Sequence, residues 1–131
     1  MSLLDKEPVK RAEKALKDFD RRLNVIILKE SARTAFDAAN SLRCQTGAIV
    51  KSLLFKIKYN FILCLVSGDK RCSLNKLKKI FDINDIAMAS PSEVKLQTGY
   101  TIGGVSPVGH SKKIEILIDN SLERFIDLYA A

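Results

Sequence analysis

The feature that most constrains the fold is a pair of apolar segments separated by a two-residue turn. The first segment covers about residues 48–58, and the second, residues 61–67, is apolar at nearly every position. Tyr59 and Asn60 stand between them, which is the spacing of a β-hairpin. The second segment is typical of a strand buried on both faces. We therefore expect a buried hairpin, around which the rest of the chain packs.

Helix signals lie on both sides of this hairpin. Apolar residues spaced three and four apart predict a variable N-terminal helix at about residues 6–23, and Thr34 can cap a short helix ending near residue 42. Ser73 caps another helix, whereas Ser90-Pro-Ser-Glu93 forms a capping box for a helix that ends at Gly99. Short strands are expected at 25–28 and 114–118, and a last helix is expected to start at Ser121. The inward residues predicted for the helices at Ser73 and Ser121 are Leu74, Leu77, Ile80 and Phe81, and Leu122, Phe125, Ile126 and Tyr129.

These elements predict an α+β fold, with a mixed, mostly antiparallel, barrel-like sheet surrounded by helices. A length of 131 residues allows one domain, which we place at residues 1–131. The longest apolar run has six residues, too few to cross a bilayer, and no secretory leader is expected.

The composition favours an anionic partner and argues against a metal site. Lys and Arg number 22 against 15 Asp and Glu, a net charge of +7 that attracts polyanions such as RNA. A single histidine and three irregularly spaced cysteines predict no zinc site, no disulfide framework and a reducing cytoplasm. One basic stripe on the N-terminal helix is either a solvated face or a contact for RNA phosphates; it comprises Lys6, Lys10, Lys14, Lys17 and Arg21.

Lys51 is the most unusual polar residue of the hairpin. Strand alternation places it on one face with Ile49, Leu53 and Phe55, which are all apolar. Lys51 lies either at the rim of a pocket or inside the pocket, where an anion would hold it. The alternative is a lysine whose ammonium extends from the sheet edge into water. Two further polar residues stand at strand ends. Ser67 belongs either to an ordinary turn or to a functional site. Asp119 either caps the next helix or orients a polar group in the site.

The second unusual feature is a glycine-rich loop, Gly103-Gly-Val-Ser-Pro-Val-Gly-His110. Its glycines allow close approach of a ligand to backbone N–H groups, and such groups can stabilise a developing oxyanion. An ordinary tight connection explains the spacing equally well. The loop lacks the Gly-Lys-Ser/Thr ending of a phosphate-binding P-loop.

These residues, in this order, resemble the YbaK/ProX family of aminoacyl-tRNA deacylases and editing domains. The resemblance covers about residue 24 to the end, and its matching stretches are residues 31–35, 47–55, 65–69, 99–110 and 118–119. The family usually continues beyond this chain's last residues with a stretch that includes a strand, so a shortened C-terminus stays open.

The resemblance implies a trans-editing enzyme that hydrolyses the ester of mischarged tRNA, without a metal or cofactor. Lys51 matches the family's key lysine near the ester and terminal adenosine, and Gly104 lies in the Gly-x-x-x-Pro loop that holds the aminoacyl group. We expect that loop and Lys51 to form one wall of the pocket. Further substrate contacts are expected from Tyr100, Gly103, Val105, Ser106, Pro107, Gly109, His110, Ser67 and Asp119.

The amino acid removed stays open among alanine, serine, threonine and cysteine. Besides tRNA, an aminoacyl-tRNA synthetase is a candidate partner, and no membrane is expected. The alternative function is an idle module of the same fold that binds tRNA or a synthetase. A lysine on an apolar strand face favours the enzyme, because a binding module has no need of one. A general RNA-binding protein is a weaker alternative, because the strands lack the exposed aromatic pairs that stack on bases.

Overall fold

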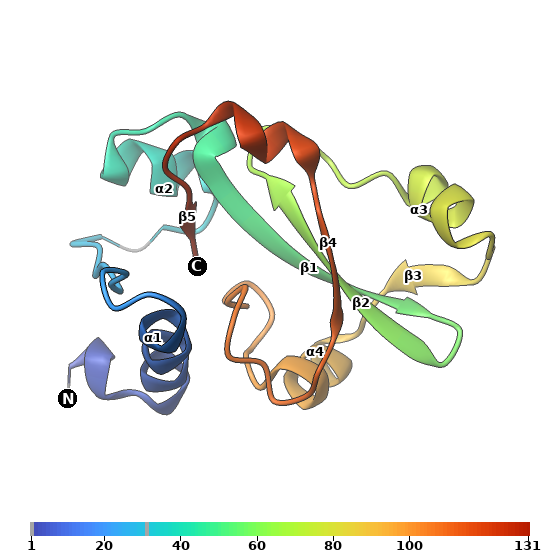
Figure 1. Cartoon of the computed structure of the whole chain (residues 1–131), viewed down its shortest axis with the longest axis horizontal. Coiled ribbons are helices and arrows are strands. Elements are labelled where there is room, and N and C mark those ends of the chain that lie inside the picture. The colour runs from blue at the N-terminus through green and yellow to red at the C-terminus, as the bar shows by residue number, and fades with distance from the viewer. Residues whose placement is uncertain (1, 31) are drawn as a thin grey trace.

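A computed structural model describes residues 2–30 and 32–131 as five strands and four α-helices, with short 3₁₀ turns between them (Figure 1). The sheet has the order β3-β1-β2-β4, and β5 pairs with the start of β1. The β1–β2 and β1–β3 pairs are antiparallel, whereas β2–β4 and β1–β5 are parallel, so the predicted mixed sheet is confirmed. The strands are β1 (Ile49–Ile57), β2 (Asn60–Ser67), β3 (Ile86–Met88), β4 (Glu115–Ile118) and β5 (Tyr129–Ala130).

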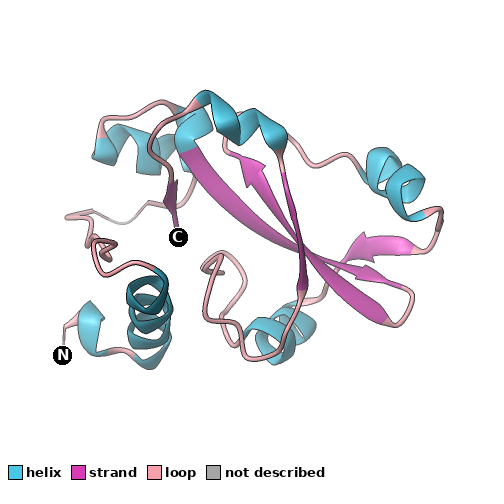
Figure 2. Cartoon of the chain, viewed as in Figure 1, coloured by secondary structure: helices cyan, strands magenta, loops and turns pink. Residues whose placement is uncertain are grey.

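The helices cover the two faces of the central hairpin (Figure 2). One face carries Phe55 and Cys64, and it packs against Leu77 of α3. The other carries Leu54 and Leu63, and it packs against α4 and the loop that follows it. The helices are α1 (Glu7–Phe19), α2 (Ala35–Leu42), α3 (Leu74–Phe81) and α4 (Pro91–Thr98). Because strand side chains alternate, the hairpin separates two apolar cores, as its two-sided apolar sequence predicted.

The predicted helix caps at Thr34 and Ser90 and the helix end at Gly99 are confirmed. The Thr34 hydroxyl accepts a hydrogen bond from the Asp37 N–H, and Ser90 and Glu93 form both bonds of the capping box. Gly99 ends α4 with φ +80°, a left-handed conformation that favours glycine. Ser31, in one stretch that matches the family, lies outside the described residues.

The predicted N-terminal helix is present as α1, but it ends at Phe19 instead of near residue 23, and Phe19 is 85% exposed. Two other predictions near the chain ends are wrong. Residues 25–28 form no strand. The helix predicted from Ser121 is a 3₁₀ turn, η3 (Asn120–Arg124), after which Ile126 is fully exposed and Tyr129 enters β5. Pairing of β5 with β1 gives the backbone of this segment a partner that a helix could not provide.

The buried face of α3 is narrower than predicted. Leu77 is buried and Phe81 is partly buried, but Ile80 is 63% exposed and Leu74 38% exposed. A helix of eight residues can bring only one or two turns against the sheet, so the outer apolar residues stay in water. No helix in the described part of the chain combines the length and apolar character needed to span a bilayer.

Candidate functional site

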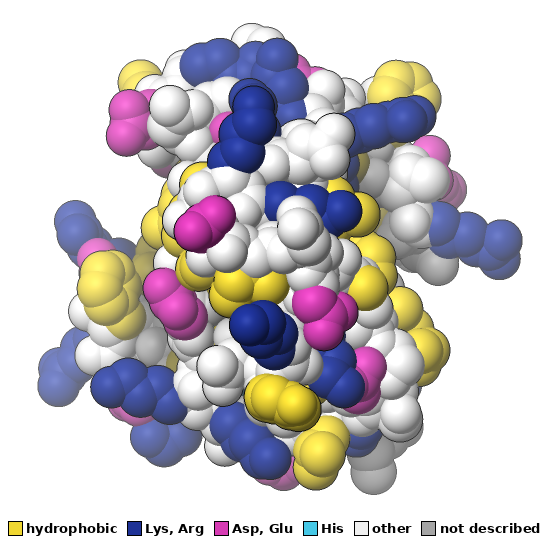
Figure 3. Space-filling model, turned by 90° about the vertical axis from the view of Figure 1, so that its right-hand side faces the viewer, with side chains coloured by type: hydrophobic (Ala, Val, Ile, Leu, Met, Phe, Trp, Pro, Cys, Tyr) yellow, Lys and Arg dark blue, Asp and Glu magenta, His cyan; other side chains and the backbone are white. Residues whose placement is uncertain are grey.

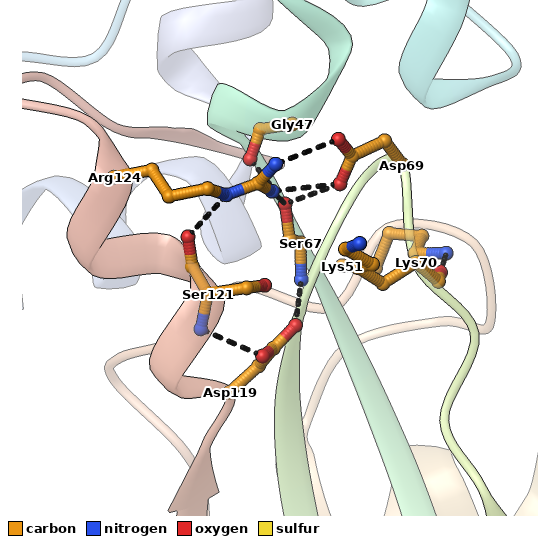
Figure 4. A network of polar contacts seen from close by, with 8 residues as sticks. All are labelled: Gly47, Lys51, Ser67, Asp69, Lys70, Asp119, Ser121 and Arg124. Carbon is orange, nitrogen blue, oxygen red and sulfur yellow. Dashed lines mark hydrogen bonds and ion pairs between the residues drawn. The ribbon is translucent and has the colours of Figure 1, made fainter.

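A polar cluster lies where β2 ends, and Figure 4 shows its members. The Arg124 guanidinium meets both carboxylate oxygens of Asp69, with Nη1–Oδ2 and Nη2–Oδ1 distances of 3.1 and 2.8 Å. Its Nη2 also donates to the Ser67 hydroxyl, which lies 2.5 Å from the Gly47 carbonyl oxygen. The hydrogen bonds from Arg124, and after them one from the Ser67 hydroxyl at 2.9 Å, lower the pKa of Asp69 to about 2. Asp69 is therefore ionised at neutral pH and ties three segments of the chain together.

Asp119 joins the end of β4 to the end of β2. One carboxylate oxygen accepts from the Ser121 N–H at 2.9 Å, and the other accepts from the Ser67 N–H at 3.1 Å. Burial alone would raise the pKa of Asp119, but these backbone hydrogen bonds outweigh burial and lower it. Asp119 therefore caps η3, as one interpretation predicted, and also cross-links two strand ends.

Lys51 lies beside this cluster, partly buried on β1. Its ammonium donates to the Lys70 carbonyl oxygen at an Nζ–O distance of 2.5 Å. An ammonium has three N–H donors, so this bond fixes its direction and leaves two donors for another group. The end of the hairpin thus brings together Lys51, Ser67 and Asp119, three residues that the sequence had singled out separately.

The remaining candidate residues form a second cluster beneath α1. The Tyr100 hydroxyl donates to the Val108 carbonyl at 2.8 Å, and the His110 Nε2 lies 2.8 Å from the Ser106 carbonyl oxygen. Arg11 of α1 donates to the carbonyl oxygens of Gly99 and Gly109, with its guanidinium 4.6 Å from the centre of the Tyr100 ring. These contacts pin α1 onto the loop, so the N-terminal helix is part of this cluster.

Strand alternation argues against one wall made of Lys51 and the glycine-rich loop. Tyr100 and Val105 pack with Leu54 and Leu63, on one face of the hairpin. Lys51 is an odd-numbered position of β1, so its side chain leaves the strand on the other face, as Phe55 does. Lys51 and Leu54 are three positions apart on β1, so their side chains leave the strand on opposite faces.

Gly103 and Gly104 of the loop differ in how strongly the backbone conformation and the surrounding space require a glycine. Gly103 has φ +85°, whereas a Cβ on Gly104 would meet no atom closer than 3.8 Å. The Gly104 N–H donates to the Thr101 carbonyl at 3.0 Å, so it closes a turn and does not point toward a ligand. The turn explains Gly104 structurally, and Gly103 is the position that the backbone constrains.

Two surface hollows of the described chain lie away from Lys51. One, of about 450 Å³, lies between the 43–48 segment and residues 125–129; the other, of about 360 Å³, lies beside the hairpin turn. No group of three or more histidine, cysteine or acidic side chains is placed to hold a metal among the described residues. On the face that includes α3, basic side chains are interspersed with acidic and apolar ones (Figure 3).

Comparison with known proteins identifies the class of this fold. The sequence-family model of the aminoacyl-tRNA editing domain matches residues 29–131 of this chain. The Bacillus subtilis protein YwhH is 32% identical over 114 residues, which cover 86% of this chain and 72% of YwhH. A crystal structure described as a candidate trans-editing enzyme for prolyl-tRNA synthetase superimposes with a TM-score of 0.86 at 36% identity, covering 92% of this chain and 76% of that one.

The chain therefore belongs to the aminoacyl-tRNA editing domain family. It also resembles a part of larger enzymes. The proline–tRNA ligase of Kosmotoga olearia is 33% identical over 119 residues, which cover 91% of this chain but 19% of the ligase. The chain thus spans about a fifth of the length of this ligase and about a sixth of several others.

Proposed function

We propose that this domain hydrolyses the ester bond of mischarged aminoacyl-tRNA, acting in trans in the cytoplasm. The observation that carries the proposal is Lys51, held on a largely apolar strand face by the Lys70 carbonyl in a chain of the editing family. The alternative is a module that binds tRNA or a synthetase without hydrolysis. Such a module would need no ammonium whose direction is fixed and whose remaining donors are available.

The chemistry asks little of the protein, because an aminoacyl ester is already activated. Water attacks the ester carbonyl, with the neighbouring ribose hydroxyl able to assist, and the carbonyl oxygen gains negative charge. The bond to the terminal ribose oxygen then breaks, and that oxygen takes up the proton that water loses, which leaves free amino acid and tRNA. The Lys51 ammonium is proposed to donate to the carbonyl oxygen with the N–H groups that Lys70 leaves free. Asp119 and Ser67 fix the strand ends around it.

We propose no metal for this reaction, because the sequence offers one histidine and three separated cysteines as ligands. The substrate is proposed to carry a small amino acid: alanine, serine, threonine or cysteine. The tRNA for proline is the first to test, because the relatives include proline–tRNA ligases. A synthetase gains only ~1–3 kcal/mol of discrimination from one methylene, so mischarging with a small amino acid calls for a separate editing step.

The test is a deacylation panel in which tRNA for proline carries each of these amino acids in turn. Wild-type protein should hydrolyse at least one of them, with or without a chelator. Lys51→Ala should lose about 10²-fold in turnover, the typical effect of removing one donor to an oxyanion. Lys56→Ala is the matched control, because Lys56 lies on the same strand but pairs with Glu93 at 3.2 Å. Full activity in folded Lys51→Ala would remove Lys51 from the mechanism, and binding without hydrolysis would favour the alternative.

The glycine-rich loop is proposed as a separate substrate contact and needs its own test. Gly104→Val should fold normally, because a Cβ at this position meets only Thr101, at an ordinary contact distance of 3.8 Å. If the loop contacts the aminoacyl end, this variant should lose turnover while Lys51 stays intact. Normal turnover would assign the loop to structure alone.

The net charge of +7 supports binding to the phosphates of tRNA. Because counterions are released on binding, affinity should fall steeply when salt rises from about 50 to about 200 mM. Lys10 and Lys14 of α1 are both exposed, and Lys14 pairs with Asp18 at 2.8 Å. Lys10 is therefore a candidate contact for tRNA phosphates. Salt-independent binding would contradict the contact with phosphates.

A further inference from the structure

Arg124 gathers three segments of the chain at the end of the hairpin. Its Nε donates to the Ser121 carbonyl at 2.7 Å, and its Nη2 donates to the Ser67 hydroxyl at 2.9 Å. Both Nη atoms face the Asp69 carboxylate, in a two-pronged arrangement that matches the planar guanidinium. A lysine carries the same charge but has no planar fork, so it cannot make this set of bonds.

The space for this pair depends on Gly47. A Cβ on Gly47 would lie 2.9 Å from the Arg124 Nη2 and 2.9 Å from the Asp69 Oδ2, closer than real Cβ contacts. The Arg124 guanidinium also lies over the Phe125 ring, with its central carbon 4.8 Å from the ring centre. Arg124 is therefore enclosed by specific neighbours even though its side chain is 42% exposed.

The pair connects to Lys51 through one turn of the chain. Asp69 lies in the turn from Ser67 to Lys70, which the Lys70 N–H closes by donating to the Ser67 carbonyl at 3.0 Å. The carbonyl of Lys70 then accepts from the Lys51 ammonium. Arg124 holds Asp69, Asp69 fixes the turn, and the turn presents the oxygen that orients Lys51 (Figure 4).

We propose that Arg124 is a positioning residue, which orients the Lys51 ammonium through Asp69 and the carbonyl of Lys70. The functional half of this inference rests on the proposed deacylation, whereas the structural half does not. Without Arg124 the turn is released, and Lys51 loses its fixed direction. Misplacing a reacting group by about 1 Å can cost about 10²-fold in rate, so kcat should fall between about 10- and 100-fold with KM nearly unchanged.

The activity experiment compares Arg124→Ala and Arg124→Lys with wild type on the mischarged tRNA that wild type hydrolyses fastest. Both variants should lose kcat. Alanine removes the charge and the hydrogen bonds, and lysine keeps the charge but has no planar guanidinium to hold Asp69. Methylguanidinium added to Arg124→Ala should restore part of kcat. Arg22→Ala is the matched control, since Arg22 forms a similar fork with Asp20 on an exposed surface. Loss of kcat in Arg22→Ala, or wild-type kcat in a folded Arg124 variant, would overturn the proposal.

A second experiment needs no catalytic activity. Lysines are acetylated with a limiting amount of acetic anhydride, and the extent at each is measured by mass spectrometry. In folded Arg124→Ala, Lys51 should react several-fold faster than in wild type, whereas Lys56 should not change. If Arg124→Ala fails to fold, Arg124→Lys and Asp69→Asn give the same comparison. An unchanged Lys51 in folded variants would overturn the positioning role, even if wild type deacylates no tRNA and the proposed function fails.

Discussion

Replacement of Gly68 by alanine is the sharpest test of how the strand-end turn is packed. An added Cβ would lie 2.3 Å from the Thr46 carbonyl oxygen, 2.9 Å from the Ala35 Cβ and 3.1 Å from the Ile49 carbonyl oxygen. An unstrained contact between non-bonded atoms is ~3.5 Å or longer. Two of the three neighbours are backbone atoms, which cannot turn away as a long side chain can, so η2 (Thr46–Ala48) or the turn must move.

The expected magnitude follows from this overlap. Overpacking of this kind costs about 1–3 kcal/mol, which should lower Tm by about 4–12 °C for a domain of this size. Gly104→Ala is the control, because its Cβ meets no atom within 3.8 Å and its effect should stay within about 0.5 kcal/mol. Thermal unfolding followed by circular dichroism measures both. A Tm for Gly68→Ala within about 2 °C of wild type would refute close packing of the turn against the 46–49 segment.

Three further changes test other contacts. Because Arg124 lowers the pKa of Asp69 to about 2 from its ordinary 3.8, the ionised pair stabilises the fold above about pH 4 and is lost as pH falls through about 2. Asp69→Asn should therefore lower Tm at pH 7 but hardly at pH 2, and an equal difference at both would contradict this. Burial raises the pKa of the Cys64 thiol to about 12 and leaves the side chain 3% exposed, so iodoacetamide should modify Cys44 before unfolding and Cys64 only afterwards; early modification of Cys64 would count against the core packing. Ser90→Ala removes one bond of the capping box and should cost about 1 kcal/mol in urea unfolding, whereas no loss would show that the cap is redundant.

The central hairpin and the caps could be predicted because their signals are local. A two-residue turn between apolar runs predicts a hairpin, and Ser90-Pro-Ser-Glu93 determines a helix start within four residues. β3 and β5 could not be predicted in the same way. They have three and two residues, and each is a strand because an edge of β1 offers backbone partners.

The candidate site was predictable only in part. Lys51, Ser67 and Asp119 stood out because each is a polar residue at a strand or on an apolar face. Arg124 did not, because it is one of 22 basic residues and its partners lie 55 and 57 residues away. The incorrect prediction of a last helix also drew attention away from Arg124, because the apolar residues after Ser121 are spaced as on one face of a helix.

The separation in sequence between the hairpin and Arg124 has a consequence for folding. The hairpin closes over two residues, whereas the Arg124–Ser67 contact closes a loop of 57, which costs more chain entropy and forms later. A folding intermediate that contains β1 and β2 therefore carries Lys51 without the residues that orient it. Pulse-labelling hydrogen exchange during refolding should show the hairpin amides protected before the Ser121 amide. From these loop lengths we expect the candidate site to form only after the hairpin.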